Sequence, residues 1–334
     1  MPNQLIIMDD HNQNAFFKKI HSAVLLSILF CASLFLGHTA QASTTFNVTV
    51  FYPDVRKPYS MIFETITNGI KEHPEINLSV QRISKTTTEA EILKSLQQKN
   101  PNAVIMLGGG FKSLQEKLNA SFKTLYGAAF FSSQDIEKGI MGVSMDPAPS
   151  LLFKELKKLH PNIKRVHVVF EPNANGWLIE KAQQSTKEQG ITLIPHQATN
   201  VKQAALIYKE IAQNNQHDES ALWLLHHDPT LDSKSLLPRI LVDAWKYKQV
   251  VISSNPAHVR RGALFSLLPD NQQIGKDLAD MTVNILNGQT ANMEPMKSSL
   301  VVANLRTAKH LSNFLMLKQK KNFALTYPKG GSYD

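Results

Sequence analysis

The glycine run Gly108-Gly109-Gly110 is the first segment whose residue types could bind a ligand. It follows the apolar run AVIML and lacks the Lys and Ser/Thr that complete a P-loop. Glycines at the start of a helix expose backbone N–H groups, which bind carboxylates or phosphates. A tight strand-to-helix turn would use the same residues, so the run is compatible with both interpretations.

Two further segments are similar to fragments of enzyme sites. Gly142 to Asp146 (GVSMD) approaches the GxSxG turn of serine hydrolases, but Asp146 replaces the last glycine. His226-His227-Asp228 follows an apolar run and is the best metal-like cluster. Adjacent histidines point to opposite sides of an extended chain, and the HExxH pattern is absent. We therefore interpret His226 and His227 as polar loop residues at the mouth of a cleft, and we expect no metal.

The protein is basic overall, but its basic residues are not clustered in the sequence. The 334 residues include 36 Lys and Arg against 27 Asp and Glu, which gives a net charge of +9. The basic residues are scattered, and Arg260-Arg261 is a doublet without interleaved aromatic residues. Nucleic-acid binding needs a concentrated basic patch with stacking platforms, so we expect no nucleic-acid partner. The charge could still favour an anionic or zwitterionic ligand.

The first 42 residues have the pattern of a cleaved secretory signal peptide. Lys18-Lys19 precede the apolar run Ala23 to Gly37, and Ala40-Gln41-Ala42 supplies the small-x-small pattern that signal peptidase reads. The run is shorter than the roughly 20 residues of a spanning helix, although an uncleaved anchor is the alternative. Cleavage before Ser43 would remove Cys31, the only cysteine, and would place the mature protein in the periplasm.

From Phe46 onward, short apolar runs alternate with amphipathic segments, which is typical of βα units on parallel sheets. The expected strands are residues 46–52, 78–83, 103–107, 125–130, 165–170, 191–195, 221–225, 250–253, 263–267 and 299–303. The expected helices are one beginning at Pro58 and residues 88–98, 150–159, 177–189, 201–213, 234–247 and 274–286. Beyond Leu311 the chain is basic and weakly patterned. Ligands bind at the carboxyl ends of strands in such sheets, so the loops after the strands should carry the site.

Three segments, in this order and spacing, resemble substrate-binding proteins of ABC transporters. They are Gly142 to Trp177 (with PNIKRV), His258 to Gly288 (with GAL and ILNG) and Ser298 to Leu311 (with NLRTAKHL). The resemblance is to the subgroup with the type 1 periplasmic-binding fold that includes tryptophan- and phenylalanine-binding members. Together with the signal peptide, it covers nearly the whole mature chain.

The resemblance implies an α/β fold of two Rossmann-like lobes with parallel sheets, joined by three hinge crossings. Lobe one would comprise residues 45–142 and 263–292, and lobe two residues 143–262 and 298–315. Residues 316–334 would form a basic C-terminal tail. The crossings are expected near Val143, near Arg261-Gly262 and within residues 293–298. A small ligand would bind between the lobes and close them by hinge bending.

The resemblance also implies a set of ligand-binding residues. In amino-acid binders of this kind, hydroxyls and backbone amides hold the ligand carboxylate and an acidic residue binds the ammonium. Asp146, Asp228 or Asp270 could supply that acidic group. No cofactor and no catalytic residue is implied. The candidate ligand-binding residues are Asp54, Tyr59, Gly109, Gly110, Ser144, Asp146, Asn173, Asn175, Asp228, Asn255 and Asp270.

Three functional hypotheses remain at this point. The leading one is a periplasmic binding protein, not an enzyme, that captures a small polar ligand such as an amino acid and delivers it to an inner-membrane permease. The second keeps the fold but makes the protein a ligand-sensing subunit for a membrane sensor kinase or cyclase. The third is a secreted enzyme, either a hydrolase that uses Ser144 or a metalloenzyme that uses His226-His227.

Overall fold

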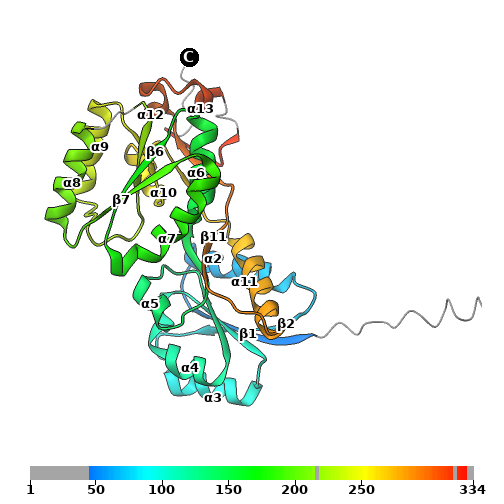
Figure 1. The fold of residues 1–334 in the computed structure, drawn as a ribbon. Coiled ribbons are helices and arrows are strands. Elements are labelled where there is room, and N and C mark those ends of the chain that lie inside the picture. The colour runs from blue at the N-terminus through cyan, green and yellow to red at the C-terminus, as the bar shows by residue number, and fades with distance from the viewer. Residues whose placement is uncertain (1–44, 215–217, 319–321, 329–334) are drawn as a thin grey trace, which may run out of the picture. The chain divides into compact units, whose positions relative to one another are not determined.

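The computed structural model describes residues 45–214, 218–318 and 322–328. The expected signal peptide, residues 1–42, lies outside the described residues. Within the described ranges, the helices are too short or too polar to cross a membrane. The described chain contains two mostly parallel sheets with helices on both faces, which confirms the predicted α/β class (Figure 1).

The first sheet has six strands in the order β11-β5-β4-β3-β1-β2, and every pairing in it is parallel. Its strands are β1 (Phe46–Pro53), β2 (Ile76–Ile83), β3 (Ala103–Leu107), β4 (Lys123–Gly127), β5 (Gly142–Pro147) and β11 (Met293–Met296). Its helices are α2 (Tyr59–Lys71), α3 (Glu89–Lys99), the 3-10 helix η1 (Gly109–Leu114), α4 (Gln115–Ser121), α5 (Ser133–Glu137) and α11 (Asn271–Leu286).

The second sheet has seven strands in the order β13-β12-β10-β9-β8-β6-β7. Its strands are β6 (Arg165–Phe170), β7 (Thr192–Gln197), β8 (Ser220–Leu224), β9 (Val250–Ser253), β10 (Phe265–Leu267), β12 (Val301–Asn304) and β13 (Leu325–Tyr327). Its helices are α6 (Pro149–Leu159), α7 (Pro172–Gln189), α8 (Val201–Asn214), α9 (Leu236–Lys246), α10 (Pro256–Arg261), α12 (Leu305–His310) and α13 (Phe314–Lys318). Only the β10–β12 pairing is antiparallel among the described strands.

Alternating side chains of the buried strands divide the core between the two faces of each sheet. In β3, Ile105 packs with α2 and α11, whereas Val104 and Met106 pack with α3 and α4 on the opposite face. In the second sheet, α8 and α9 cover one face, and α6 and α7 cover the other. Helices α2 and α11 approach so closely that a Cβ on Gly275 would lie 2.1 Å from the backbone oxygen of Ile66.

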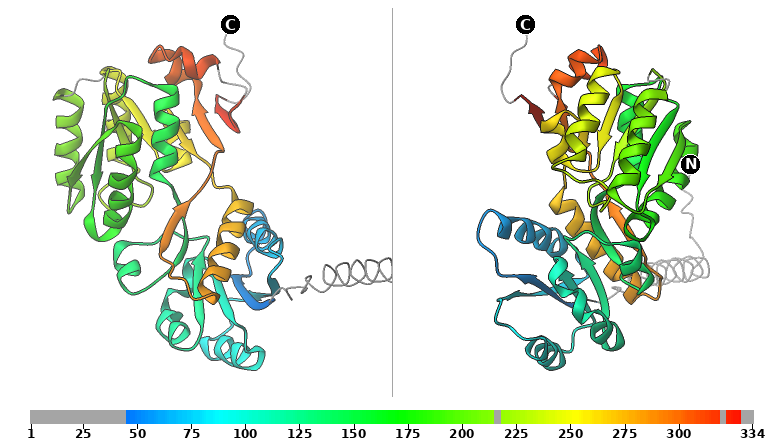
Figure 2. Two further views of the ribbon diagram at one scale, coloured as in Figure 1. Left: turned by 45° about the vertical axis from the view of Figure 1, so that its right-hand side comes forward. Right: turned by 90° about the vertical axis from the view of Figure 1, so that its left-hand side faces the viewer.

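The chain passes three times between the sheets, and the crossing segments are hydrogen-bonded to one another (Figure 2). They connect β5 to α6, β10 to α11 and β11 to β12. The N–H of Ala148 donates to the carbonyl of Met296 at 2.9 Å, which joins the first crossing to the third. Ser298 Oγ donates to the carbonyl of Leu268 at 2.6 Å, which joins the third to the second. The three crossings therefore form one connected hinge region.

Strand pairing places two crossings later than the sequence pattern suggested. We expected residues 263–292 to belong with the first half, but β10 pairs with β9 and β12 in the second sheet. We also expected a crossing near Val143. Instead, Val143 lies in β5, which pairs with β4 at its start and with β11 as far as Pro147. Both short strands are fixed by long-range pairing, which local periodicity does not encode.

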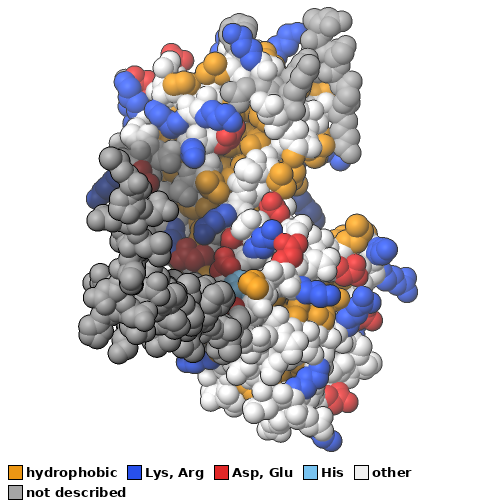
Figure 3. Space-filling view, turned by 90° about the vertical axis from the view of Figure 1, so that its right-hand side faces the viewer, with side chains coloured by type: hydrophobic (Ala, Val, Ile, Leu, Met, Phe, Trp, Pro, Cys, Tyr) orange, Lys and Arg blue, Asp and Glu red, His pale blue; other side chains and the backbone are white. Residues whose placement is uncertain are grey.

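The C-terminal region contains more regular structure than its composition indicated. Helix α13 follows α12, and β13 pairs in parallel with β12 at the edge of the second sheet. We had expected residues 299–303 to be the last strand. A three-residue strand carries too little pattern to be recognised. On the face shown in Figure 3, Lys and Arg side chains lie among Asp and Glu side chains, as the scattered basic residues predicted.

Candidate functional site

Loops at the carboxyl ends of both sheets meet at an aromatic contact. The Phe130 ring, which follows β4, stacks on the ring of His226, with centroids 4.1 Å apart and an interplanar angle of 14°. The His227 ring meets the same phenyl ring edge-on at 4.3 Å. Both histidines follow β8 of the second sheet. The contact therefore joins the two halves through three planar rings.

His226 is the least solvated group of this contact. Burial, assisted by His227 and His258, lowers the pKa of His226 to about 3, so its imidazole is neutral at physiological pH. Its Nδ1 is buried and has no hydrogen-bond partner in the described part of the chain. A neutral imidazole with an unsatisfied ring nitrogen can bind a polar ligand atom.

A second contact between the halves joins α5 to the start of α7. Ser133 Oγ accepts a hydrogen bond from the N–H of Trp177 at 3.1 Å and donates to the carbonyl of Pro172 at 3.0 Å. Trp177 Nε1 donates to the carbonyl of Phe131 at 3.0 Å. Trp177 is buried, and its indole N–H is satisfied by the backbone of the other half. Its ring is thus an anchor of the contact between the halves.

Asp146 and Ser144 lie in β5, immediately before the first crossing. Asp146 is 3% exposed and Ser144 is fully buried. Ser144 Oγ donates to Asp146 Oδ2 at 2.8 Å, and the Asp146 N–H donates to Ser144 Oγ at 3.1 Å. Burial raises the pKa of the Asp146 carboxyl to about 6, against the opposing effect of the Ser144 hydrogen bond. Asp146 can therefore exchange a proton, or bind a cation, close to neutral pH.

Asp228 and Asn175 are brought together, as two members of the predicted set. Asp228 Oδ2 accepts from Asn175 Nδ2 at 2.9 Å and from the N–H of Glu171 at 2.8 Å. Its Oδ1 accepts from the N–H and the hydroxyl of Thr230. Asp228 therefore ties the loop after β6 to the loop after β8, and these four donors occupy both of its oxygens.

Three other predicted residues lie at helix starts. Asn255 Oδ1 accepts from the N–H of Ala257, and Asp270 Oδ1 accepts from the N–H of Gln273, so both side chains cap helices. Asn173 is exposed and donates to Glu171 Oε1 at 3.1 Å. These side chains follow strands of the second sheet or precede α11, but each already has a local partner.

Four other predicted residues of the first half are exposed, beyond the ends of β1 and β3. Asp54 and Tyr59 are both exposed near the carboxyl end of β1. No atom lies within 4 Å of the position that a Cβ would take on Gly109 or Gly110. Their backbone therefore borders open space, which is compatible with a ligand approaching the start of η1.

The sequence analysis missed Phe130 entirely and did not include His226 and His227 among the candidate ligand-binding residues. An aromatic residue directly after an apolar strand resembles an extension of the core, so Phe130 was assigned to the strand itself. The signal that could have found it is positional, because Phe130 follows β4 at the same sheet edge as the glycines after β3. Across the described ranges, no group of three His, Cys, Asp or Glu side chains is placed to hold a metal ion.

Two cavities are found at other places in the structure. One, of about 460 Å³, lies beside the crossings and is bounded by residues that include Asp270 and Ser298. The other, of about 980 Å³, lies within the second half between α9, α10 and α12. Asp270 is the one predicted residue that borders either cavity.

Comparison with known proteins identifies one family. Residues 132–315 match the model of the family described as ABC transporter substrate binding protein. No curated protein sequence gives a significant match.

Solved structures share the fold at low sequence identity. A ligand-free, open substrate binding protein with adhesive properties from Clostridium difficile has a TM-score of 0.53 and 16% identity, covering 80% of this chain and 95% of its own. A XylFII–LytSN complex has a TM-score of 0.50 and 14% identity, covering 75% and 96%. An ABC domain in complex with L-Trp from Streptococcus pneumonia has a TM-score of 0.48 and 16% identity, covering 84% and 99%.

Proposed function

The chain belongs to the family of ABC transporter substrate binding proteins, and we propose that it captures a small polar ligand in the periplasm and delivers it to an inner-membrane permease. The ligand would bind between the two halves, at the carboxyl ends of their parallel strands. The signal-like pattern of residues 1–42 supports an extracytoplasmic location.

The observation that carries this proposal is the contact of Phe130 with His226 and His227. Three rings from loops of two different sheets meet there, and the halves are also linked by the hydrogen-bonded crossings, the α5–α7 contact and the Lys181–Glu294 ion pair. A ligand with a planar group could insert between the rings of Phe130 and His226, and a donor elsewhere on the ligand could bond to the unsatisfied Nδ1. Hinge bending at the crossings would admit it.

Polar groups that could bind the charged ends of a ligand lie along the carboxyl edge of the first sheet. The loops after β3 and β4 and the end of β5 lie on adjacent strands, which brings Gly110, Phe130 and Asp146 to one sheet edge. Backbone N–H groups at Gly110 could bind a ligand carboxylate. The Asp146 carboxyl, with its pKa near 6, could bind an ammonium group. An amino acid or a related zwitterion is the ligand class that these groups favour.

A thermal-shift screen with amino acids, other small polar compounds and purine-like compounds tests the proposal. A ligand present at 100 times its Kd stabilises the folded state by about 2.7 kcal/mol, which gives a clear rise in melting temperature. A complete screen without any such rise would argue against a small-molecule binding function.

Variants then locate the site of any ligand found. Phe130→Ala should weaken its binding at least several-fold, whereas Phe122→Ala, at the opposite end of β4, should not. Gly110→Ala should leave stability unchanged, because its Cβ would meet open space, but should weaken binding if the backbone there holds the ligand. If all three variants bound the ligand with the affinity of the native protein, the ligand would bind somewhere other than at this contact.

Ligand sensing is the alternative role within the same fold. One structural neighbour is a XylFII–LytSN complex, so we retain a sensor protein as the alternative membrane partner. Co-purification with the products of adjacent genes separates the two roles. Ligand-stimulated ATP hydrolysis by a reconstituted permease would support delivery, and ligand-dependent association with a sensor would support signalling.

An enzymatic role has less support. The family, and the structural neighbour from Clostridium difficile, are described as binding proteins. The hydroxyl of Ser144 is fully buried and donates to a carboxylate, Asp146, rather than to a histidine base. We therefore propose binding without catalysis.

A further inference from the structure

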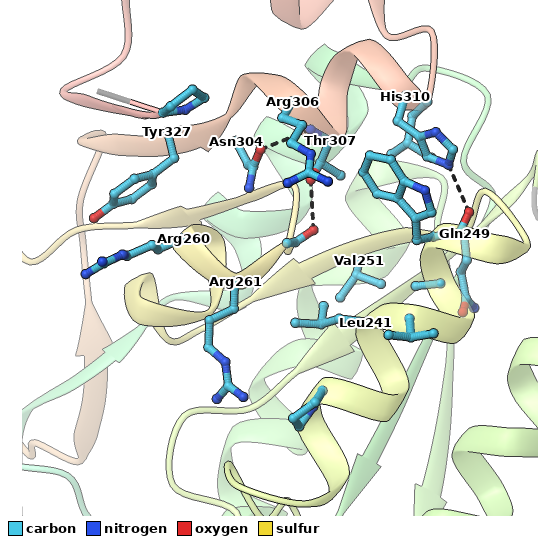
Figure 4. A pocket seen from close by; sticks show the side chains of 17 residues that line it. Leu241, Gln249, Val251, Arg260, Arg261, Asn304, Arg306, Thr307, His310 and Tyr327 are labelled. Atoms are coloured by element: carbon cyan, nitrogen blue, oxygen red, sulfur yellow. Dashed lines mark hydrogen bonds between the residues drawn. The ribbon is translucent and has the colours of Figure 1, made fainter. Parts of the chain in front are cut away.

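The larger cavity lies away from the contact between the halves. It has a volume of about 980 Å³ and is bounded by α9, α10, α12 and the end of β13 (Figure 4). Gln249 and Gly262 border it just before β9 and β10 begin, and Asn304 borders it at the end of the antiparallel β12. The cavity is thus at the amino ends of β9 and β10, whereas Phe130 and His226 meet at carboxyl ends.

Cationic side chains border this cavity without acidic ones. Arg260 and Arg261 come from α10 and Arg306 from α12, and no Asp or Glu is among the described residues that border the cavity. Neither Arg260 nor Arg306 forms an ion pair with any carboxylate of the described ranges. Figure 4 shows Arg306 in the upper part of the view and Arg261 below it, pointing downward, with Leu241 and Val251 to the right of Arg261.

Two of these guanidinium groups are held in place by neighbours that leave donors free. Arg261 Nη1 donates to the carbonyl of Ser233 at 2.7 Å. Arg306 Cζ lies 5.2 Å from the centroid of the Trp245 ring, and the His310 ring stacks on the same indole with centroids 3.6 Å apart. A cation held by a π face keeps its N–H groups available for carboxylate or phosphate oxygens.

We propose that this cavity is a second ligand site, which binds a small molecule carrying a phosphate or carboxylate group. Its volume is in the range of small-molecule sites. Arg306 would bind the anionic group, and Leu241, Val251 and Trp245 would contact an apolar part. The anion could be a dissolved metabolite or the headgroup of a lipid, since both present the same chemistry.

Calorimetric titration with phenyl phosphate, using phenol as the uncharged counterpart, tests the dissolved form. Saturable binding of phenyl phosphate without binding of phenol is expected. Arg306→Gln should raise the Kd about tenfold, the loss typical of one charge-assisted contact. Arg239→Gln, which removes the same charge from the exposed face of α9 outside the cavity, should leave it unchanged.

Trp245 offers a second readout, because it is 39% exposed whereas the other described tryptophans are buried. Phenyl phosphate should change its emission with the same Kd, and added salt should weaken binding. Sedimentation with phosphatidylglycerol vesicles, against phosphatidylcholine vesicles, tests the headgroup. Lipid binding that Arg306→Gln abolishes would support that source. No saturable binding in either format, or an equal Kd in Arg306→Gln and Arg239→Gln, would overturn the proposal.

Discussion

Replacing Asp146 with Asn should stabilise the protein at neutral pH and leave it unchanged in acid. Burial raises the pKa of this carboxyl from its ordinary 3.8 to about 6. A carboxyl whose pKa is higher in the folded state binds its proton more tightly there. Its contribution to stability is therefore complete below about pH 3.8 and is lost as the pH rises through about 6. Above that pH the folded protein contains a buried carboxylate.

The pKa difference sets the size of the effect. A shift from 3.8 to about 6 corresponds to about 3 kcal/mol at pH 7.5. The amide that replaces the Asp146 carboxyl would carry no charge, and its oxygen could still accept the hydrogen bond from Ser144. We expect Asp146→Asn to gain about 1–3 kcal/mol at pH 7.5, because part of the gain is offset by burying the new amide donors.

Urea denaturation at five values from pH 4 to pH 8 measures this effect. The difference between variant and native protein isolates Asp146, since other titrating groups contribute equally to both. That difference should be near zero at pH 4 and should level off above pH 6. Asp54→Asn is the matched control, because the Asp54 side chain is exposed. A variant less stable than the native protein at pH 7.5, or a difference independent of pH, would refute this reasoning.

Three further substitutions test other parts of the structure. Gly275→Ala should cost about 3 kcal/mol, because its Cβ would lie 2.1 Å from the backbone oxygen of Ile66; an unchanged melting temperature would contradict the close helix packing. Burial lowers the pKa of His226 to about 3, so stability present above pH 6.5 should decline by about 2 kcal/mol toward pH 4.5. His226→Phe should flatten that decline. If the variant and the native protein had identical melting curves in acid, the lowered pKa of His226 would be contradicted. Trp177→Phe removes the hydrogen bond from the buried indole N–H to the carbonyl of Phe131 and should cost about 1–2 kcal/mol in urea denaturation; no loss would mean that this bond contributes nothing to stability.

The regular elements followed closely from local sequence patterns. Residues 103–107, 165–170 and 250–253 were predicted as strands and form β3, β6 and β9 with the same bounds. Each is rich in apolar, mostly β-branched residues and is buried along almost its whole length, so its signal is strong. The sheet membership of β10 was not predicted, because it depends on pairing with β12 more than 30 residues later in the chain.

Less of the candidate site than of the fold could be predicted from the sequence. Asp228 and Asn175 were selected as polar residues at strand ends, and in the structure they bond to each other. A loop carboxylate has the same local signature whether it accepts from backbone amides or faces a ligand. Phe130 was not selected, since only the three-dimensional fold places its ring against His226. The ligand-binding roles of the selected residues stay predictions.

The three crossings also constrain the order in which the two halves can fold during synthesis. The six-stranded sheet takes α11 and its edge strand β11 from residues 271–296, near the end of the chain. A nascent chain that stops before residue 271 lacks the helix that packs against α2, so the first half cannot complete its core from the N-terminal segment alone. Folding of that half must wait for the whole second sheet except its last two strands to emerge. The first half consequently completes its core only late in synthesis, after most of the second half has been made.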